Sequence, residues 1–318
     1  MQKTVSSIPS YINLSPARGN KKTEGDSPEI QKDPMNPCDT VTIASYNVEN
    51  MFDDVDDPHK ADEKTPPKSA EDMKAVASTL NKANADIVIL EEVENREMLN
   101  TLVDDYMKSS DYPERVIVPG NDPRGINVAV LSRFPVSNVK SHKDNHFKVK
   151  DGHIYKKEIR FSRDLLETDI KVAPGFTVTV YAAHLKSQIG GERADEKRLA
   201  EAQEIRRLIE EDMKDYPGKA FVVAGDFNDS PQSMPVQAIV GSGDKALEDP
   251  LAPLPMAEQY TYTYKGNQER LDYILLSPEL QKDYVKDSAH VLRNPEAMKG
   301  SDHNPIELSI RVPEKKAA

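Results

Sequence analysis

Acidic and amide side chains follow an apolar run in the last third of this sequence. Residues 221–224 are rich in β-branched and aromatic residues, which is typical of a buried strand, and Gly225, Asp226 and Asn228 come after them. If the strand continues, Asp226 and Asn228 emerge on one face, because they are two residues apart. They could then converge on a cation, a water or a phosphate oxygen. Turns favour the same residue types for conformational reasons, so the pattern indicates function only if it recurs.

The pattern recurs at other predicted strand ends. Polar residues close an apolar run at Asn47, Glu92 and His184, and open one at Asp272 and at the pair Asp302 and His303. If all these side chains share one site, the last two strands run antiparallel to the others at that edge. The sequence therefore predicts mixed sheets rather than an all-parallel sheet.

Each of these residues also has a purely structural explanation. Asn47 and Asp302 could end strands in turns, and Glu92 could begin the next helix in solvent. His184 could be a hydrogen-bonded core histidine, and Asp272 could pair with a neighbouring arginine. Each of these explanations can account for a single residue. They do not explain why so many polar residues lie at equivalent strand ends. The set together predicts a site.

The hydrophobic periodicity places these residues on alternating strands and helices. Strands are predicted at 41–46, 86–90, 126–131, 176–183, 270–276 and 305–310, and a hairpin at 148–158 that turns at Asp151 and Gly152. Helices are predicted from Ser69, at 96–107 and at 192–214. Ser69 and Asp72 have the spacing of a capping box. The fold class predicted is α/β.

Composition suggests one folded domain with short flanking segments. Residues 1–38 are dominated by Ser, Pro, Lys, Asn, Gly and Glu and predict a flexible leader, whereas 39–313 form the predicted domain and 314–318 a charged tail. Neither an internal repeat nor a second compositional break divides this region. One domain is therefore the simpler reading.

Charge and cysteine content exclude several classes of protein. The net charge of -12 argues against a broadly basic nucleic-acid-binding surface, although it allows a local cationic groove or carboxylates neutralised by a metal. Cys38 is the single cysteine of the chain, so no intramolecular disulfide or cysteine-built zinc site can form. No apolar run is long enough to span a membrane, and no secretory signal is visible. The compartment stays undetermined.

Six motifs, in order along the chain, resemble those of the endonuclease/exonuclease/phosphatase superfamily typified by pancreatic deoxyribonuclease. They occupy residues 45–50 (Ser-Tyr-Asn-Val-Glu-Asn), 86–93, 183–186, 225–228 (Gly-Asp-Phe-Asn), 270–273 and 301–305 (Ser-Asp-His-Asn-Pro). The resemblance covers nearly all of residues 41–312. It implies a four-layer sandwich of two packed mixed β-sheets flanked by helices, with the site at one edge.

The resemblance also implies a metal-dependent phosphoric ester hydrolase. Glu92 would be the principal ligand of Mg²⁺, with Mn²⁺ as the alternative ion, assisted by Asn47 and Asp302. Hard cations of this kind prefer such oxygen ligands. Glu91 precedes Glu92 and faces the other way if the strand continues. Asp226 and Asn228 would orient or deprotonate the attacking water.

Two histidines and an arginine complete the implied site. His303 would contact the phosphate or transfer a proton, with its ring oriented by Asp272, and His184 is the second candidate acid or base. Arg163 resembles the phosphate-contacting arginine of the family, and Arg160 competes for this role. Lys186 is a further cationic candidate.

The predicted function is hydrolysis of nucleic-acid phosphodiester bonds, with endonuclease and exonuclease action both open. His184 makes the abasic-site repair branch of the family a poorer match, because that branch usually has a tyrosine-containing motif there. An enzyme of the same fold acting on a phospholipid headgroup or a small phosphate ester is the first alternative. A binding scaffold without activity is the second, which the competent residue at every expected position disfavours. No obligate protein partner is predicted.

Overall fold

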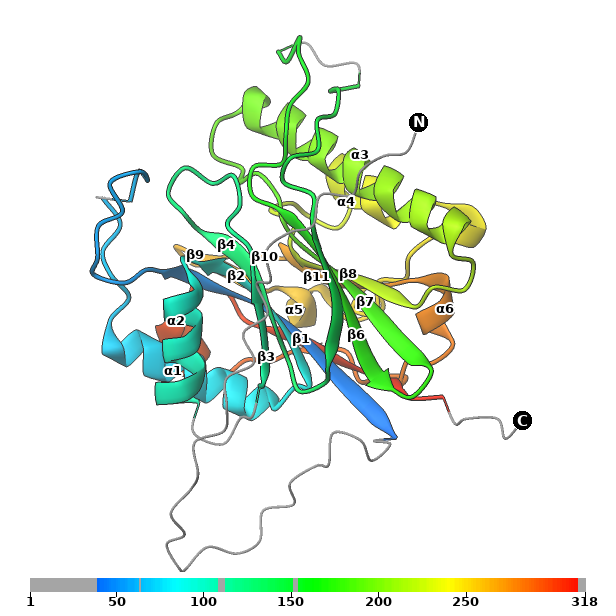
Figure 1. The fold of residues 1–318 in the computed structure, drawn as a ribbon, viewed down its shortest axis with the longest axis horizontal. Coiled ribbons are helices and arrows are strands. Elements are labelled where there is room, and N and C mark those ends of the chain that lie inside the picture. The colour runs from blue at the N-terminus through cyan, green and yellow to red at the C-terminus, as the bar shows by residue number, and fades with distance from the viewer. Residues whose placement is uncertain (1–38, 63, 108–111, 151–153, 314–318) are drawn as a thin grey trace, which may run out of the picture.

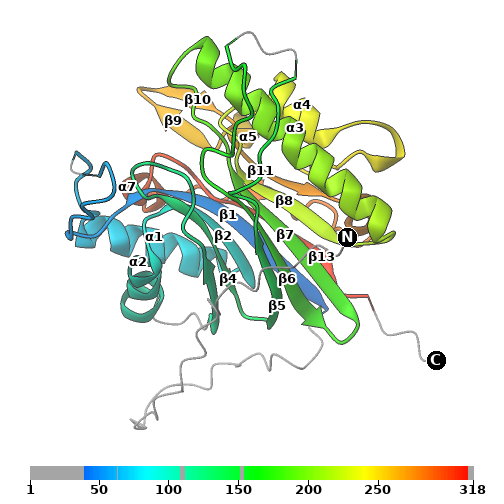
Figure 2. The same cartoon turned by 45° about the horizontal axis from the view of Figure 1, so that its top comes forward.

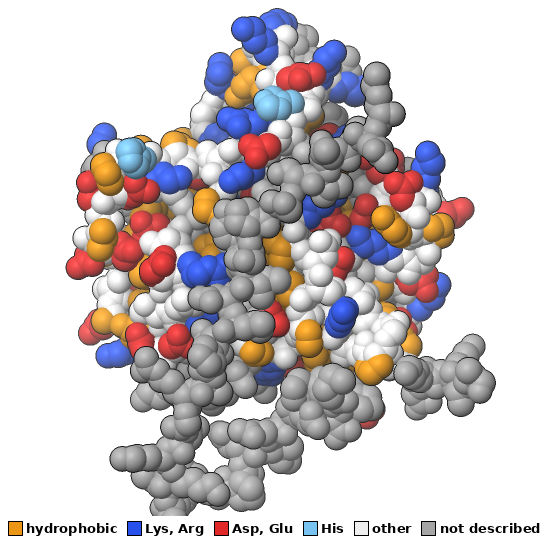
Figure 3. All heavy atoms as spheres, viewed as in Figure 1, with side chains coloured by type: hydrophobic (Ala, Val, Ile, Leu, Met, Phe, Trp, Pro, Cys, Tyr) orange, Lys and Arg blue, Asp and Glu red, His pale blue; other side chains and the backbone are white. Residues whose placement is uncertain are grey.

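The computed structural model describes residues 39–62, 64–107, 112–150 and 154–313 (Figure 1). The predicted leader, the predicted charged tail and the turn at Asp151 and Gly152 lie outside these residues. Within the described part of the chain, no helix is both long enough and apolar enough to cross a membrane. Figure 3 shows acidic and basic side chains interspersed over one face of the molecule.

The first sheet has six strands in the order β12-β13-β1-β2-β4-β3. They are β1 (Thr40–Met51), β2 (Ile87–Val93), β3 (Glu114–Ile117), β4 (Asn127–Ser132), β12 (His290–Val291) and β13 (Ile306–Arg311). Strands β1 and β2 are parallel, whereas β13 is antiparallel to β1 and β4 is antiparallel to β2. The sheet is therefore mixed.

The second sheet has five strands in the order β11-β8-β7-β6-β5. They are β5 (Val136–Ser141), β6 (Leu165–Ala173), β7 (Phe176–His184), β8 (Phe221–Asp226) and β11 (Asp272–Leu276). Strands β7 and β8 are parallel and β11 is antiparallel to β8. The last long strand of each sheet thus runs antiparallel to its neighbour, as the shared site required. A separate hairpin joins β9 (Tyr262–Tyr264) to β10 (Asn267–Glu269).

The two sheets pack face to face and helices cover their outer faces (Figures 1 and 2). Outside the first sheet lie α1 (Ala70–Ala83), α2 (Arg96–Thr101), the π-helical turn Leu102–Tyr106 and α7 (Ala297–Gly300). Outside the second sheet lie α3 (Glu192–Asp215) and α4 (Met234–Val240), and the short elements are η2 (Gly243–Lys245), α5 (Met256–Gln259) and α6 (Pro278–Gln281). This arrangement confirms the predicted four-layer sandwich.

The predicted helices form with small differences. Ser69 caps α1, since its hydroxyl accepts a hydrogen bond from the backbone N–H of Asp72. Helix α3 matches its predicted span closely. The predicted helix at 96–107 changes to π-helical turns after Thr101. An isolated antiparallel bridge joins Phe147 to Ile159, the two residues that flank the predicted hairpin at 148–158.

Alternation along the strands builds the site. The inner face of β8 places Val222 and Ala224 in the core between the sheets, and Asp226 is next on that face. The same alternation brings Asn47 at β1, Glu91 at β2, His184 at β7 and Asp272 at β11 to the inner faces. The apolar core between the sheets therefore ends in polar side chains at one edge.

Gly225 allows the two central strands of the second sheet to approach each other at this edge. Its φ is +134°, and a Cβ atom would lie 1.9 Å from the carbonyl oxygen of Ala183 on β7. Only glycine fits this position without movement of the backbone.

We expect Gly225→Ala to lower the free energy of unfolding by about 3 kcal/mol or more, because backbone strain adds to a direct clash. Gly218→Ala is the matched control: its φ is +85° but nothing lies within 4 Å of its Cβ position. The control should lose only about 1 kcal/mol. Urea denaturation measures both, and equal losses would show that the clash is absent.

Candidate active site

A cavity of about 1090 Å³ opens where the polar ends of the two sheets meet. Its lining includes all the predicted site residues except Asp272, which lies just behind it: Asn47, Glu92, Arg163, His184, Asp226, Asn228, Asp302 and His303. The structure thus brings residues from widely separated motifs into one place. This is the geometry that the strand-end pattern predicts.

Asp226 lies at the centre and links the two sheets. Its Oδ2 accepts a hydrogen bond from Asn47 Nδ2 at 3.0 Å, across the gap between the sheets. Asn228 adds bonds from its backbone N–H at 2.8 Å and from its side-chain amide at 3.1 Å. Burial, and next the charge of Asp272, raise the pKa of Asp226 to about 7. The carboxylate is therefore poised to take up a proton near neutral pH.

His303 and Asp272 form the predicted pair. The Nδ1 atom of His303 lies 2.8 Å from Asp272 Oδ2, and both residues are buried. Burial by itself would lower the pKa of His303, but the charge and hydrogen bond of Asp272, with the charges of Asp226 and Asp302, together outweigh burial and raise this pKa to about 10. His303 is therefore an imidazolium at neutral pH. Arg270 pairs with Asp249, so the alternative partner of Asp272 is excluded.

His184, in contrast to His303, is neutral. Its Nε2 lies 3.4 Å from Asp226 Oδ2 and 4.0 Å from Glu92 Oε1. Burial, and next the positive charge of Arg163, hold the pKa of His184 well below its usual value. The sequence does not distinguish the two histidines, but in the structure His184 is neutral and His303 is cationic.

Glu92 reaches the cavity because the strand deforms there. The pairing of β2 with β4 shifts register between Leu90 and Val93, and Glu92 has a φ of +66°. Seven described non-glycine residues have positive φ, and four of them line the cavity: Glu49, Asn50, Glu92 and Asn228. Strain of this kind is concentrated at functional sites.

Glu91 also belongs to the site, which corrects the expectation that it would face away. Regular alternation with Ile87 and Ile89 places Glu91 on the inner face, fully buried, with Oε1 accepting a hydrogen bond from the Ser45 hydroxyl at 3.1 Å. Burial, and then repulsion by Asp272 and Asp226, raise the pKa of Glu91 well above its usual value. Burial and the neighbouring carboxylates therefore both favour the protonated form of Glu91, which lies behind the cavity.

The donor set fits a hard divalent cation. Glu92, Asp302 and Glu49 bring carboxylates to the same cavity, and Asn47 adds an amide oxygen. Burial raises the pKa of Asp302 to about 6, with further increases from the charges of Glu49 and Glu92. Carboxylates that repel one another in this way are the environment that a cation stabilises.

Asp226, Asp272 and His303 form a second group, with ligand atoms within 4.8 Å of one another. These three residues already interact with one another. His303 is hydrogen-bonded to Asp272, and its positive charge lies between the two carboxylates. This group therefore fits proton transfer better than metal binding.

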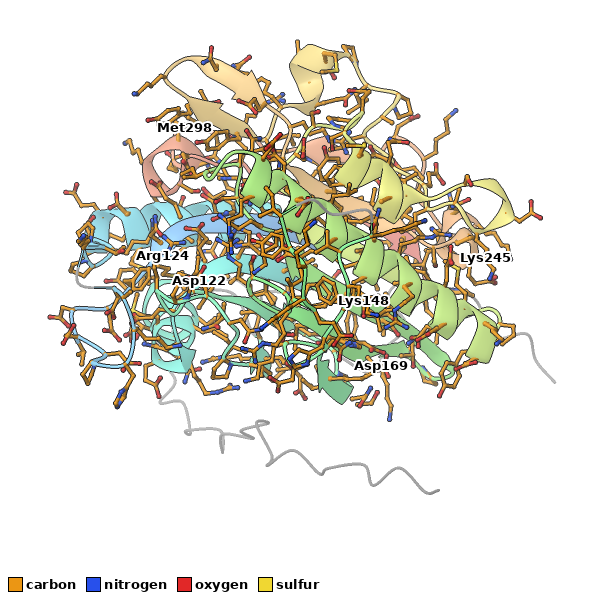
Figure 4. All side chains as sticks on the ribbon, turned by 90° about the horizontal axis from the view of Figure 1, so that it is seen from above. Asp122, Arg124, Lys148, Asp169, Lys245 and Met298 are labelled. Atoms are coloured by element: carbon orange, nitrogen blue, oxygen red, sulfur yellow. The ribbon has the colours of Figure 1, made fainter. Side chains whose placement is uncertain are left out.

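Cationic side chains line another part of the cavity. The guanidinium of Arg163 is buried and fixed, with Nε 3.1 Å from Asp122 Oδ2 and a terminal nitrogen 2.7 Å from the Leu185 carbonyl oxygen. Arg160 is half exposed, 3.5 Å from Asp144. Asp122 also pairs with Arg124, on the same loop (Figure 4). Both candidate arginines thus face the cavity, but only Arg163 is rigidly held.

Several residues of the site were not assigned from the sequence, among them Glu49, Asp122, Arg124 and Tyr262. Glu49 stands inside the first motif, where its Oε2 accepts a hydrogen bond from the Asp302 N–H at 3.1 Å. Asp122 and Arg124 come from the loop before β4, and Tyr262 packs its ring 4.8 Å from the His303 ring. The motif of residues 45–50 pointed to Glu49, whereas nothing in the sequence joins Tyr262 to His303.

Comparison with known proteins shows to which family this chain belongs. The model of the Endonuclease/Exonuclease/phosphatase family matches residues 42–302. The chain belongs to this family. Members of the family are phosphoric ester hydrolases and generally use divalent metals. A comparison with curated proteins finds no match.

Solved structures of the family share the fold. Truncated TDP2 from Caenorhabditis elegans has a TM-score of 0.58 at 19% identity, covering 86% of this chain and 98% of that chain. The human Nocturnin catalytic domain with a bound sulfate anion has a TM-score of 0.59 at 17% identity, covering 85% and 93%. A family protein from Leptotrichia buccalis has a TM-score of 0.56 at 17% identity, covering 86% and 100%. At these identities the similarity establishes the fold alone.

Asp272→Asn should lower the pKa of His303 from about 10, because burial then acts against the imidazolium with less opposition. NMR titration of the imidazole protons, with chelator present, measures the change. His290, which pairs with Glu307 outside the cavity, is an internal control whose titration should not move. A His303 titration that is unchanged in the variant would mean that Asp272 does not set its charge.

Glu91→Gln should make the protein more stable at pH 7. Because the pKa of Glu91 is raised in the folded state, the wild-type protein loses stability as pH rises above the unfolded value of 4.5. Glutamine has no proton to lose, and its amide oxygen can still accept from Ser45. Urea denaturation should therefore show a gain at pH 7 that disappears below about pH 4. Exposed Glu158→Gln is the control, and a similar gain there would contradict the argument.

Proposed function

We propose that this protein is a divalent-metal-dependent phosphodiesterase that hydrolyses nucleic-acid phosphodiester bonds. The observation that carries the proposal is the pairing, in one cavity, of a carboxylate that titrates near neutral pH with an imidazolium. Asp226 is the base and His303 is the acid, with Nε2 of His303 4.0 Å from Asp226 Oδ2. General acid–base catalysis works best with groups whose pKa values are shifted in this way.

Hydrolysis needs an attacking water and a protonated leaving group. Asp226 would take a proton from the water as its oxygen bonds to phosphorus, while Asn228 orients the carboxylate. The bond from phosphorus to the leaving oxygen breaks, and His303 would give that oxygen its Nε2 proton. Asp272 holds the opposite side of the ring and so keeps the donating nitrogen aimed into the cavity.

The remaining residues would bind the substrate and the cation. Glu92, Asn47 and Asp302 would hold Mg²⁺ or Mn²⁺, which when bound neutralises phosphate charge. Arg163 would contact a non-bridging phosphate oxygen, since its guanidinium is already fixed in place. His184 is neutral, so it would bond to the phosphate or the water without carrying charge.

Cationic residues around the cavity favour nucleic acid over the alternative substrates. Five of the lining residues are basic: Arg124, Arg160, Arg163, Lys186 and Lys197. Several phosphates in a row need several such contacts, whereas one headgroup phosphate does not. The net charge of -12 therefore does not prevent several phosphate contacts at this cavity, although six carboxylates line it as well.

Purified protein should cleave plasmid, single-stranded DNA or RNA with Mg²⁺ or Mn²⁺ and not with chelator. Asp226→Asn should lower the rate by roughly a hundredfold to ten-thousandfold, the usual effect of losing a general base. Exposed Asp244→Asn is the control and should retain full activity. Cleavage that survives in Asp226→Asn would remove Asp226 from the mechanism. Absence of cleavage with any metal would move the proposal to phospholipids and small phosphate esters.

A further inference from the structure

A row of aromatic rings leads from His303 out of the cavity. The Tyr262 ring lies 4.8 Å from the His303 ring, and the Tyr264 ring lies 6.4 Å beyond it with the planes 9° apart. Tyr262 and Tyr264 are two residues apart on β9, so they share one face of the β9–β10 hairpin. Both rings line the cavity. The aromatic surface is thus continuous with the proposed proton donor.

The hairpin is fixed against the site. Tyr262 bridges to His303, the Thr263 N–H donates to the Asp302 carbonyl at 3.1 Å, and the Asn304 N–H donates to the Thr261 carbonyl. Lys265 and Gly266 make the two-residue turn with φ values of +49° and +83°. The position of the two rings is therefore set by backbone hydrogen bonds rather than by loop motion.

Core packing does not account for Tyr264. Its relative exposure is 52%, and it belongs to none of the three hydrophobic clusters of the described residues. Lys265 places its ammonium group 5.0 Å from the ring centroid. Because this ammonium group lies over the ring, a planar ligand that stacks on the half-exposed ring would take the place of a long, flexible side chain.

Tyr262 and Tyr264 lie on a different part of the lining from its basic residues, although Phe161 lies among the latter. The basic lining residues come from the loop of 120–126 and from segments 160–163 and 186–197, and none of them comes from the hairpin. Figures 2 and 4 show the hairpin at one side of the molecule and Arg124 on a different loop. A nucleic-acid strand has the same separation, with phosphates along one side and bases along the other. The basic part of the lining could therefore contact the phosphates of a nucleic-acid strand while the hairpin contacts its bases.

We propose that Tyr264, with Tyr262 between it and His303, stacks on an unpaired base close to the phosphate that is cleaved. Bases inside a duplex are already stacked on their neighbours, so an aromatic side chain reaches a base face only in unpaired nucleic acid. The preferred substrate is then single-stranded or locally unpaired. This inference rests on the proposed function, since it places the phosphate at Asp226 and His303.

Binding to two matched oligonucleotides tests the stacking directly. One probe is a twelve-residue oligothymidine, and the other has the same length and phosphates but abasic spacers in place of every base. Both are titrated with Mg²⁺ present against Asp226→Asn protein, which prevents cleavage. We expect Tyr264→Ala to weaken binding of oligothymidine about tenfold, in the range measured for base–aromatic stacking, and to leave the abasic probe within about twofold.

Two further variants separate stacking from a structural effect. Tyr264→Phe keeps the ring and should keep the affinity, and Asn267→Ala changes an exposed residue of the same hairpin and should have no effect. The proposal is overturned if Tyr264→Ala weakens both probes equally or neither. It is also overturned if that change reduces binding only to phosphatidylcholine vesicles, because the hairpin would then contact lipid.

Failure of this inference can be distinguished from failure of the proposed function. If the wild-type protein cleaves DNA or RNA but the two probes respond alike to Tyr264→Ala, the stacking is wrong and the nuclease stands. If no nucleic acid is cleaved but the contrast between the probes holds, the stacking stands and the assignment of the reaction is wrong.

Discussion

Burial of the Asp226 carboxylate between two sheets is the constraint on which the rest of the site depends. A buried carboxylate without partners is strongly destabilising, so the surrounding structure must supply hydrogen bonds or a proton. Asn47 supplies one hydrogen bond from the opposite sheet, and Asn228 supplies two from the turn after β8. The contact between Asn47 and Asp226 thus joins the two sheets at the point where their apolar interface ends.

Charge at this edge is balanced across several groups rather than within one ion pair. Burial and nearby carboxylates favour the protonated form of Glu91, the carboxylates around His303 keep it positively charged against the effect of burial, and burial with nearby cations keeps His184 neutral. The backbone makes a similar adjustment, since Glu92 enters the cavity only through a bulge with positive φ. The fold therefore provides an electrostatic environment before any substrate binds, as catalysis by preorganised groups requires.

Much of this could be read from the sequence, because alternation along a strand and polar strand ends are local patterns. They were sufficient to predict the mixed sheets and a shared site, whereas the pairing of Asp272 with His303 was predicted from the family resemblance. The bulge at Glu92 could not be predicted, since it depends on how β2 pairs with β4, and the position of Glu91 was therefore wrong. The charge states of the histidines and the aromatic row of the hairpin also depend on contacts between distant segments. Strands β3 and β5 are short and have no strong alternation, whereas β6 alternates clearly from Leu166 to Val172 and was missed nonetheless.

The most direct test of the account is a crystal structure with Mn²⁺, located by its anomalous scattering. Mn²⁺ prefers the same carboxylate, carbonyl and water ligands as Mg²⁺. The account predicts an ion coordinated by Glu92, with Asn47 or Asp302 nearby, at distances of about 2.1 Å, while His303 stays bonded to Asp272. An ion held instead by Asp226, Asp272 and His303 would contradict the division between the metal site and the acid–base pair. Absence of bound manganese in this cavity would contradict the metal-dependent mechanism itself.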